Sequence, residues 1–237
     1  MSNVDFKLDE SVAVLTMNSG ENRFNPDFLN ALRRVLDTIE TETEARTLIV
    51  TSGHEKIFSN GLDLDWLVPV IQKQDSATAK SFFYLLMDTF KRVATYPLLT
   101  IAALSGHAFA GGAIFSCAFD YRFMRADRGF FCFPEVDLGI PFLPGMMALL
   151  KKAIPYTVLE DMVFSGRRLT AEECRTNRIV RTACPMPELL PEALAFAKSL
   201  NKKRSTVAEM KKRMNKPIVD AIEKEDPVYI ESGVFHV

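Results

Sequence analysis

The residues best suited to chemistry lie in one stretch, SGHAFAGGAI, at positions 105–114. An apolar run at 98–104 precedes it and predicts a buried strand, and a second apolar run at 115–119 predicts a helix. A glycine pair between a strand and a helix leaves backbone N–H groups without intrahelical partners at the positive end of the helix dipole. Because such groups can bind an oxyanion, the stretch predicts an anion-binding turn.

Two further segments carry groups that complement this turn. FSNGLDL at 58–64 contains a second glycine turn, and FPEVDLG at 133–139 places the carboxylate of Glu135 after an aromatic strand. Apolar flanks raise the pKa of a buried carboxyl toward the range in which a general base operates. The alternative is purely structural: glycine turns that only permit close packing, and a Glu135 that starts a helix or faces solvent.

In this order and spacing, the three segments resemble the crotonase family, also called the enoyl-CoA hydratase/isomerase family. The resemblance covers nearly the whole chain, from the strand at 12–17 to the helix start at 169–173. It implies an α/β fold built as a superhelical spiral of ββα turns, followed by a C-terminal helical region. The implied domains are a crotonase-like core at 1–197 and a helical region at 198–237 that takes part in trimerisation.

The resemblance also implies a mechanism. The family holds the thioester oxygen of an acyl-CoA between two backbone N–H groups, which match those of Gly111 and Leu62. Removal of a proton beside the thioester carbonyl makes an enolate, and each preorganised donor to its oxygen contributes roughly 3 kcal/mol. Glu135 matches the family's catalytic glutamate, so the implied catalytic set is Glu135, Gly111 and Leu62.

Position 114 departs from the pattern of the family's hydratases. They carry a second glutamate three residues after the oxyanion glycine, and the two carboxylates together activate water. Ile114 can neither hold nor deprotonate water, so we expect hydration to be weak. A single base can instead move a proton from C2 to C4 of a 3-enoyl-CoA, as the Δ3,Δ2-enoyl-CoA isomerases of fatty-acid β-oxidation do.

Two alternatives stay open. One is a different enolate reaction on an acyl-CoA thioester, namely weak hydration, thioester hydrolysis or decarboxylation. The other is a non-catalytic member that binds acyl-CoA or RNA, to which a run of basic residues at 202–216 could contribute. Glu135 separates the classes, because a pure binding module has no need of a carboxylate beside an enolate site.

The family match also assigns residues to coenzyme A and to the acyl chain. The first glycine loop corresponds to the coenzyme-binding loop, with Lys56 and Arg23 as candidate partners of the phosphates. The expected coenzyme-binding residues are Arg23, Lys56, Ser59, Asn60, Gly61, Leu62, Asp63 and Leu64. Candidates for an apolar acyl tunnel are Trp66, Leu67, Phe83, Phe109, Phe115, Phe133 and Phe142.

Composition excludes several other classes. The 237 residues carry 29 basic and 30 acidic side chains, so the net charge of −1 favours neither nucleic acid nor an anionic membrane as partner. The three histidines show no metal-ligand spacing, and we expect no cofactor beyond the coenzyme A of the substrate. Four cysteines without CxxC spacing are typical of reduced structural thiols, and no signal peptide is apparent, so we expect the cytoplasm.

The elements that must position these residues follow from the pattern of apolar residues. Alternating strands and helices before residue 140 predict right-handed crossovers and a largely parallel sheet, and helices dominate afterwards. Asn25 and Pro26 predict a helix start, with Asn25 as the N-cap. We also expect a strand at 179–183 and a helix at 207–225 that Pro217 breaks or kinks.

Overall fold

Two sheets form the frame of the protein, whose computed structural model describes residues 3–233. The six-stranded sheet has the order β1 (Val4–Asp9), β2 (Val12–Met17), β3 (Thr47–Ser52), β5 (Leu99–Leu104), β7 (Tyr121–Arg125), β10 (Thr182–Cys184). The four-stranded sheet has the order β4 (Ile57–Ser59), β6 (His107–Phe109), β8 (Phe131–Cys132), β9 (Arg168–Leu169). Only the β1–β2 and β8–β9 pairs are antiparallel.

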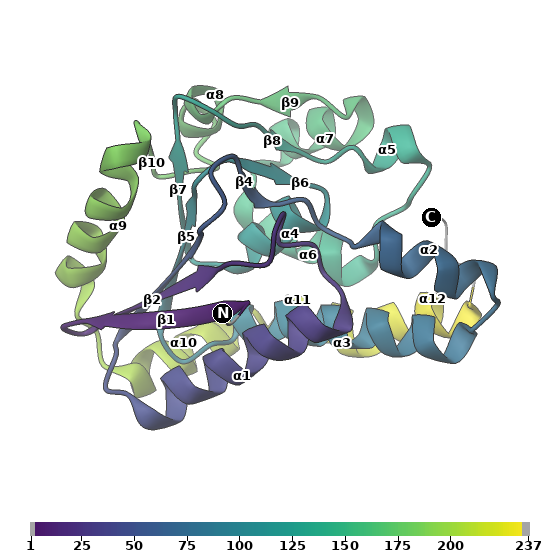
Figure 1. Cartoon of the computed structure of the whole chain (residues 1–237), viewed down its shortest axis with the longest axis horizontal. Coiled ribbons are helices and arrows are strands. Elements are labelled where there is room, and N and C mark those ends of the chain that lie inside the picture. The colour runs from purple at the N-terminus through teal and green to yellow at the C-terminus, as the bar shows by residue number, and fades with distance from the viewer. Residues whose placement is uncertain (1–2, 234–237) are drawn as a thin grey trace.

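The chain winds through both sheets in repeated ββα turns. In each of three successive pairs, β3–β4, β5–β6 and β7–β8, the first strand joins the larger sheet and the second joins the smaller one. The strands of successive turns lie parallel and adjacent in both sheets (Figure 1). This arrangement confirms the expected superhelical spiral. The second sheet is an addition to the single sheet that alternation of elements predicted.

Helices fill the remaining positions of each turn and then cover the spiral. Those of the spiral are α1 (Pro26–Glu42), α2 (Leu64–Gln72), α3 (Ser76–Ala94), α4 (Gly111–Ala118) and α5 (Glu135–Leu138). They are followed by α6 (Pro144–Ala153), α7 (Tyr156–Ser165), α8 (Ala171–Thr176) and α9 (Met186–Leu200). The last helices are α10 (Arg204–Met214), α11 (Lys216–Asp220), the π-helical turn η1 (Ala221–Glu225) and α12 (Asp226–Ser232).

Two apolar cores hold the sheets and helices together. The main core lies between the sheets and helices such as α1, α3 and α4, and contains fully buried phenylalanines including Phe24, Phe90 and Phe115. A smaller core lies between the six-stranded sheet and α9, which covers its outer face (Figure 1). The predicted start of α1 is confirmed, since the Asn25 side chain accepts a hydrogen bond from the Phe28 N–H.

The C-terminal helices differ in detail from the prediction. The expected break in the helix at 207–225 is confirmed, but it lies at Asn215, and Pro217 follows in the first turn of α11, where its missing N–H leaves no helical bond unmade. The strand expected at 179–183 is shorter and later, at Thr182–Cys184. The expected domain boundary at 197/198 lies inside α9. Through residues 3–233, no helix has both the length and the apolar character needed to cross a bilayer.

Candidate active site

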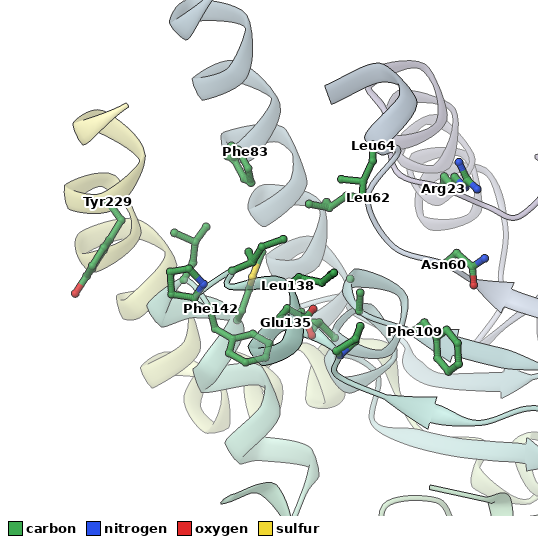
Figure 2. Close-up of a pocket in the computed structure, with 18 of the residues that line it drawn as sticks. Arg23, Asn60, Leu62, Leu64, Phe83, Phe109, Glu135, Leu138, Phe142 and Tyr229 are labelled. Atoms are coloured by element: carbon green, nitrogen blue, oxygen red, sulfur yellow. The ribbon is translucent and has the colours of Figure 1, made fainter. Parts of the chain in front are cut away.

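A cavity of about 730 Å³ lies where the first turns of the spiral meet α6 and α12. Its walls are mostly apolar, with polar groups at one end and near the middle. The lining residues are Arg23, Asn60, Leu62, Leu64, Asp65, Phe83, Phe109, Ala110, Gly111, Ile114, Pro134, Glu135, Leu138, Ile140, Pro141, Phe142, Leu143, Met146, Tyr229, Ile230 and Ser232. Figure 2 shows Glu135 between the Arg23 and Asn60 end and the Tyr229 end.

Two glycine turns from successive turns of the spiral meet at this cavity. Gly61 follows β4 with a φ of 78°, and a methyl group on its Cα would lie 2.6 Å from the backbone nitrogen of Gly111. A methyl group on Gly111 would in turn lie 3.2 Å from the Cα of Gly61. The two turns can approach this closely only because neither residue has a side chain.

The close approach brings the backbone donors of Leu62 and Gly111 to one cavity. Phe24 donates its N–H to the carbonyl of Gly61 at 2.7 Å and accepts the N–H of Asp63 at 3.0 Å. In such a parallel bridge, the N–H of Leu62 points away from Phe24. Neither the Leu62 N–H nor the Gly111 N–H donates a hydrogen bond to any of residues 3–233. Both are therefore available to an oxyanion.

A strained residue sets the direction of the second donor. Ala110, the residue before α4, has φ 49° and ψ −129°, a conformation that favours glycine. Its N–H donates to the carbonyl of Cys132 at 3.0 Å, which ties the turn to the end of β8. Such strain costs about 1–3 kcal/mol and persists only where the surroundings enforce it. It turns the chain so that α4 begins at Gly111, with its positive end toward the cavity.

The Glu135 side chain lies in the same cavity, at the start of the short helix α5. It is 7% exposed, and its Oε2 has no hydrogen-bond partner among the described residues. Burial raises the pKa of Glu135 to about 7. A hydrogen bond from its own backbone N–H lowers the pKa by a smaller amount. The carboxylate can therefore take up and release a proton near neutral pH, as a general base must.

This pKa predicts the pH dependence of any reaction that uses Glu135 as a base. Below about pH 7 the carboxyl is protonated and inactive, so we expect kcat/KM to fall about tenfold per pH unit on the acid side and to level off above pH 7. The measurement is kcat/KM over about pH 5.5 to 8.5. A profile that is level across this range would contradict the assignment of the base.

Ile114 occupies the position at which a second carboxylate would complement Glu135. It lies one turn along α4 from Gly111, lines the cavity and is 1% exposed. The other carboxylate in the lining, Asp65, is exposed and bonded to Arg23 at 2.8 Å. Glu135 is thus the one buried carboxylate among the described residues of the lining.

The structure brings together some, not all, of the predicted coenzyme-binding residues. Arg23, Asn60, Leu62 and Leu64 line the cavity. Arg23 is also engaged by two carboxylates, Glu21 at 2.6 Å and Asp65 at 2.8 Å.

The remaining predicted residues of the first loop lie outside the lining. Lys56 is exposed beyond it. Ser59 is buried beneath the loop, where its hydroxyl donates to the carbonyl of Asn22 at 2.7 Å. Asp63 accepts a hydrogen bond from Asn25 at 2.8 Å, and Gly61 packs against Gly111. These three residues shape the loop.

The acyl-tunnel candidates divide in the same way. Phe83, Phe109 and Phe142 line the cavity, while Leu67, Phe115 and Phe133 are fully buried in the core and Trp66 packs on Phe82. Sequence reasoning missed the contributions of α6 and α12, namely Met146, Tyr229, Ile230 and Ser232. Their apolar residues have helical spacing, which does not distinguish a cavity wall from core.

Other groups considered from the sequence form no second catalytic site. Cys117 is fully buried, and burial raises the pKa of its thiol, so it is inert packing. His107 lies between the rings of Phe109 and Phe130. No cluster of three histidine, cysteine or acidic residues suited to a metal ion occurs between residues 3 and 233.

Comparison with known proteins agrees with this geometry. Residues 7–236 match the family model described as enoyl-CoA hydratase/isomerase. The chain is 34% identical over 168 residues to enoyl-CoA delta isomerase 3 of Arabidopsis thaliana, covering 69% of this chain and 68% of that protein. It is 31% identical over 206 residues to a putative enoyl-CoA hydratase of Thermus thermophilus, covering 86% of this chain and 79% of that protein.

A solved structure supports the same conclusion for the fold. An enoyl-CoA hydratase/isomerase family protein from Pseudomonas syringae superposes with a TM-score of 0.89 at 24% identity, covering 98% of each chain. The ββα spiral is therefore the crotonase fold. From the match over nearly its whole length and the identity to these relatives, the chain belongs to the enoyl-CoA hydratase/isomerase family.

Proposed function

We propose that the protein isomerises 3-enoyl-CoA to 2-enoyl-CoA, as an enzyme of fatty-acid β-oxidation. The observation that carries the proposal is the pairing of one buried carboxylate, Glu135, with two unengaged backbone donors, while an isoleucine occupies position 114. The 34% identity to a protein named as an enoyl-CoA delta isomerase supports it.

The proposed reaction is a proton transfer within the substrate. Glu135 removes a proton from C2, and the electrons of that C–H bond form an enolate whose oxygen accepts hydrogen bonds from Leu62 and Gly111. The same carboxyl returns the proton at C4 while the double bond moves to C2–C3. The donors stabilise the charge by roughly 3 kcal/mol each. No electron is gained or lost overall, so the step needs no cofactor beyond the coenzyme A of the substrate.

The deciding experiment compares two reactions of the purified protein. Formation of the conjugated 2-enoyl-CoA from a 3-enoyl-CoA is followed as a rise in ultraviolet absorbance. Hydration of the matching 2-enoyl-CoA is followed as a loss of the same absorbance. The proposal requires isomerisation to be faster by a wide margin. Comparable rates would favour a hydratase, the name carried by the Thermus relative. Acyl-CoA binding without turnover would favour a non-catalytic member that binds acyl-CoA. RNA binding without turnover would favour a non-catalytic member that binds RNA.

Ile114→Glu tests why hydration should be weak. A carboxylate at this position would face Glu135 across the cavity, because position 114 lies one helical turn from Gly111. We expect the folded variant to gain measurable hydratase activity, though only a small amount, since a buried carboxylate without partners raises its own pKa and lowers stability. The measurement is 3-hydroxyacyl-CoA formation beside that of the unchanged protein. Absent hydration in a variant shown by crystallography to hold water between the two carboxylates would contradict this account.

We further propose a homotrimer or a dimer of trimers in the cytoplasm. Exposed apolar side chains on α10, Met210 and Met214, give a protomer surface to bury against a neighbour. The four cysteines are unpaired and buried, as a reducing compartment permits. Sedimentation equilibrium at micromolar concentration is expected to give about three or six times the mass of one chain. A mass of one chain would exclude the assembly.

A further inference from the structure

The apolar end of the cavity is closed by α12. Tyr229, Ile230 and Ser232 contribute to the lining from this helix. Figure 2 shows Tyr229 at the end opposite Arg23 and Asn60. Tyr229 is 58% exposed and therefore lies at the rim, whereas Ile230 is 1% exposed and forms part of the inner wall. An acyl chain that extends past Glu135 away from the polar end would meet this wall.

A second cavity lies behind the same wall. It has a volume of about 370 Å³ and lies between α3 and the segment formed by η1 and α12. Its lining residues are Tyr84, Leu85, Met87, Asp88, Lys91, Ile222, Glu223, Pro227 and Ile230. Among the described residues, Ile230 alone lines both cavities, so this side chain separates them.

A buried carboxylate holds α12 in this position. Asp226 is fully buried and its Oδ1 accepts the N–H of Gly145 at 2.7 Å, at the N-terminus of α6. Gly145 has to be a glycine, because a methyl group there would lie 2.6 Å from the other carboxylate oxygen and would also clash with Ile222. Burial raises the pKa of Asp226 to about 6, and the hydrogen bond from the Gly145 N–H opposes this shift, so the carboxyl is mostly ionised at neutral pH. Asp226 and Ile230 are four residues apart and so share one face of the helix.

The outer contacts of α12 are weaker. Glu231 bonds to Lys80 at 3.0 Å and to the Tyr84 hydroxyl at 2.8 Å, both on α3, and all three groups are partly exposed. Exposed ion pairs contribute about 0–1 kcal/mol. Removing one partner of a buried charged hydrogen bond has a much larger effect. Asp226 is therefore the main polar attachment between α12 and the cavity wall on α6.

We propose that Ile230 sets the length of acyl chain that the protein accepts, and that Asp226 is the positioning residue that holds Ile230 in place. The inference rests on the proposed function only in taking acyl-CoA thioesters as the ligands. The preferred substrates are then acyl-CoAs whose tails end against Ile230. Longer tails are excluded from the second cavity as long as this side chain closes it.

The experiment measures binding, so that it is independent of which reaction the protein catalyses. Saturated acyl-CoAs from butyryl-CoA through decanoyl-CoA to palmitoyl-CoA are titrated calorimetrically into the full-length protein. The variants are Ile230→Ala, which opens the wall, and Ile230→Phe, which thickens it. Val228→Ala is the matched control, because Val228 is on the same helix, 70% exposed, and lines neither cavity.

We expect the wild-type affinity to rise with chain length and to stop rising once the tail reaches Ile230, between butyryl-CoA and palmitoyl-CoA. Ile230→Ala should tighten palmitoyl-CoA binding by about tenfold, because further methylenes become buried. Ile230→Phe should weaken decanoyl-CoA binding by about tenfold, because the larger ring takes the space in which the last methylenes would be buried. Butyryl-CoA should change by less than about twofold in both variants, and Val228→Ala should follow the wild type throughout.

The role of Asp226 is tested by Asp226→Ala, with Asp226→Asn as the variant that keeps an acceptor for the Gly145 N–H. Asp226→Ala should weaken decanoyl-CoA binding by about tenfold and leave butyryl-CoA binding nearly unchanged, and Asp226→Asn should restore part of the loss. Equal losses for both ligands would show a merely structural role.

The outcomes distinguish the two proposals. If the folded wild-type protein binds no acyl-CoA, both the proposed function and this inference are wrong. If it binds acyl-CoA but neither Ile230 variant shifts the dependence on chain length, the inference alone is wrong.

Discussion

Glu135→Gln is expected to lower kcat by about 100- to 10,000-fold while leaving the Kd for acyl-CoA near the wild-type value. Glutamine has nearly the same size as glutamate but cannot accept a proton from C2, so the loss belongs to the chemical step. Stopped-flow or steady-state assays give kcat, and calorimetry with a saturated acyl-CoA gives Kd. Asp137→Asn is the matched control, since Asp137 is exposed two residues further on. A Glu135→Gln variant that retains most of its activity would show that another group carries the proton.

The same variant should be more stable than the wild type at high pH, which separates lost chemistry from lost folding. The folded pKa of Glu135 is about 7 against 4.5 for an ordinary glutamate. Below pH 4.5 both states are protonated and the carboxyl has no effect. Between pH 4.5 and about pH 7 the folded state binds more protons than the unfolded state. The free energy of unfolding therefore falls as pH rises through this range, by about 3 kcal/mol in total. Denaturant unfolding at pH 8 should show Glu135→Gln to be stabilised by an amount of this order.

Gly61→Ala is expected to lower kcat by about 100- to 1,000-fold, the usual effect of losing one oxyanion donor. The added methyl would lie 2.6 Å from the nitrogen of Gly111, so the loop must move and carry the Leu62 N–H out of place. The positive φ of 78° adds strain of about 1–3 kcal/mol to the folded state. Steady-state kinetics and thermal unfolding measure the two effects separately.

Gly20→Ala is the matched control for backbone strain. Gly20 also has a positive φ, 53°, but a methyl group there would meet nothing within 4 Å. It should therefore lower stability without changing kcat. If Gly61→Ala retained wild-type kcat, the donor pair would not act on the transition state. If Gly20→Ala lost activity as well, general destabilisation would explain both variants.

The spiral explains why the two donors and the base can form one site. β4 and β6 are parallel neighbours in the smaller sheet, and so are β6 and β8. The turn after β4 contains Gly61 and Leu62, the turn after β6 contains Gly111, and Glu135 follows β8. Because the carboxyl ends of parallel strands lie at one edge, three segments far apart in the chain deliver their groups to the same place.

The sequence by itself determined the local features of this site. Glycines at 61 and 111, the carboxylate after the aromatic strand, and the isoleucine at 114 are properties of single positions. The cap of α1 by Asn25 is likewise local, because the acceptor and its donor are three residues apart. Such short-range effects are what propensity and periodicity report.

Only the tertiary structure decided which residues share the cavity. The strands of the smaller sheet are two or three residues long, too short for a readable alternation, so the sequence predicted only the aromatic strand before Glu135 and not the sheet that it joins. The tertiary packing leaves Lys56 outside the cavity. It also brings Ile230 into the lining, from a helix far along the chain. Whether an apolar side chain lines a cavity or fills the core depends on how distant helices pack. The hydrogen bond between Asp226 of α12 and Gly145 of α6 is such a long-range contact.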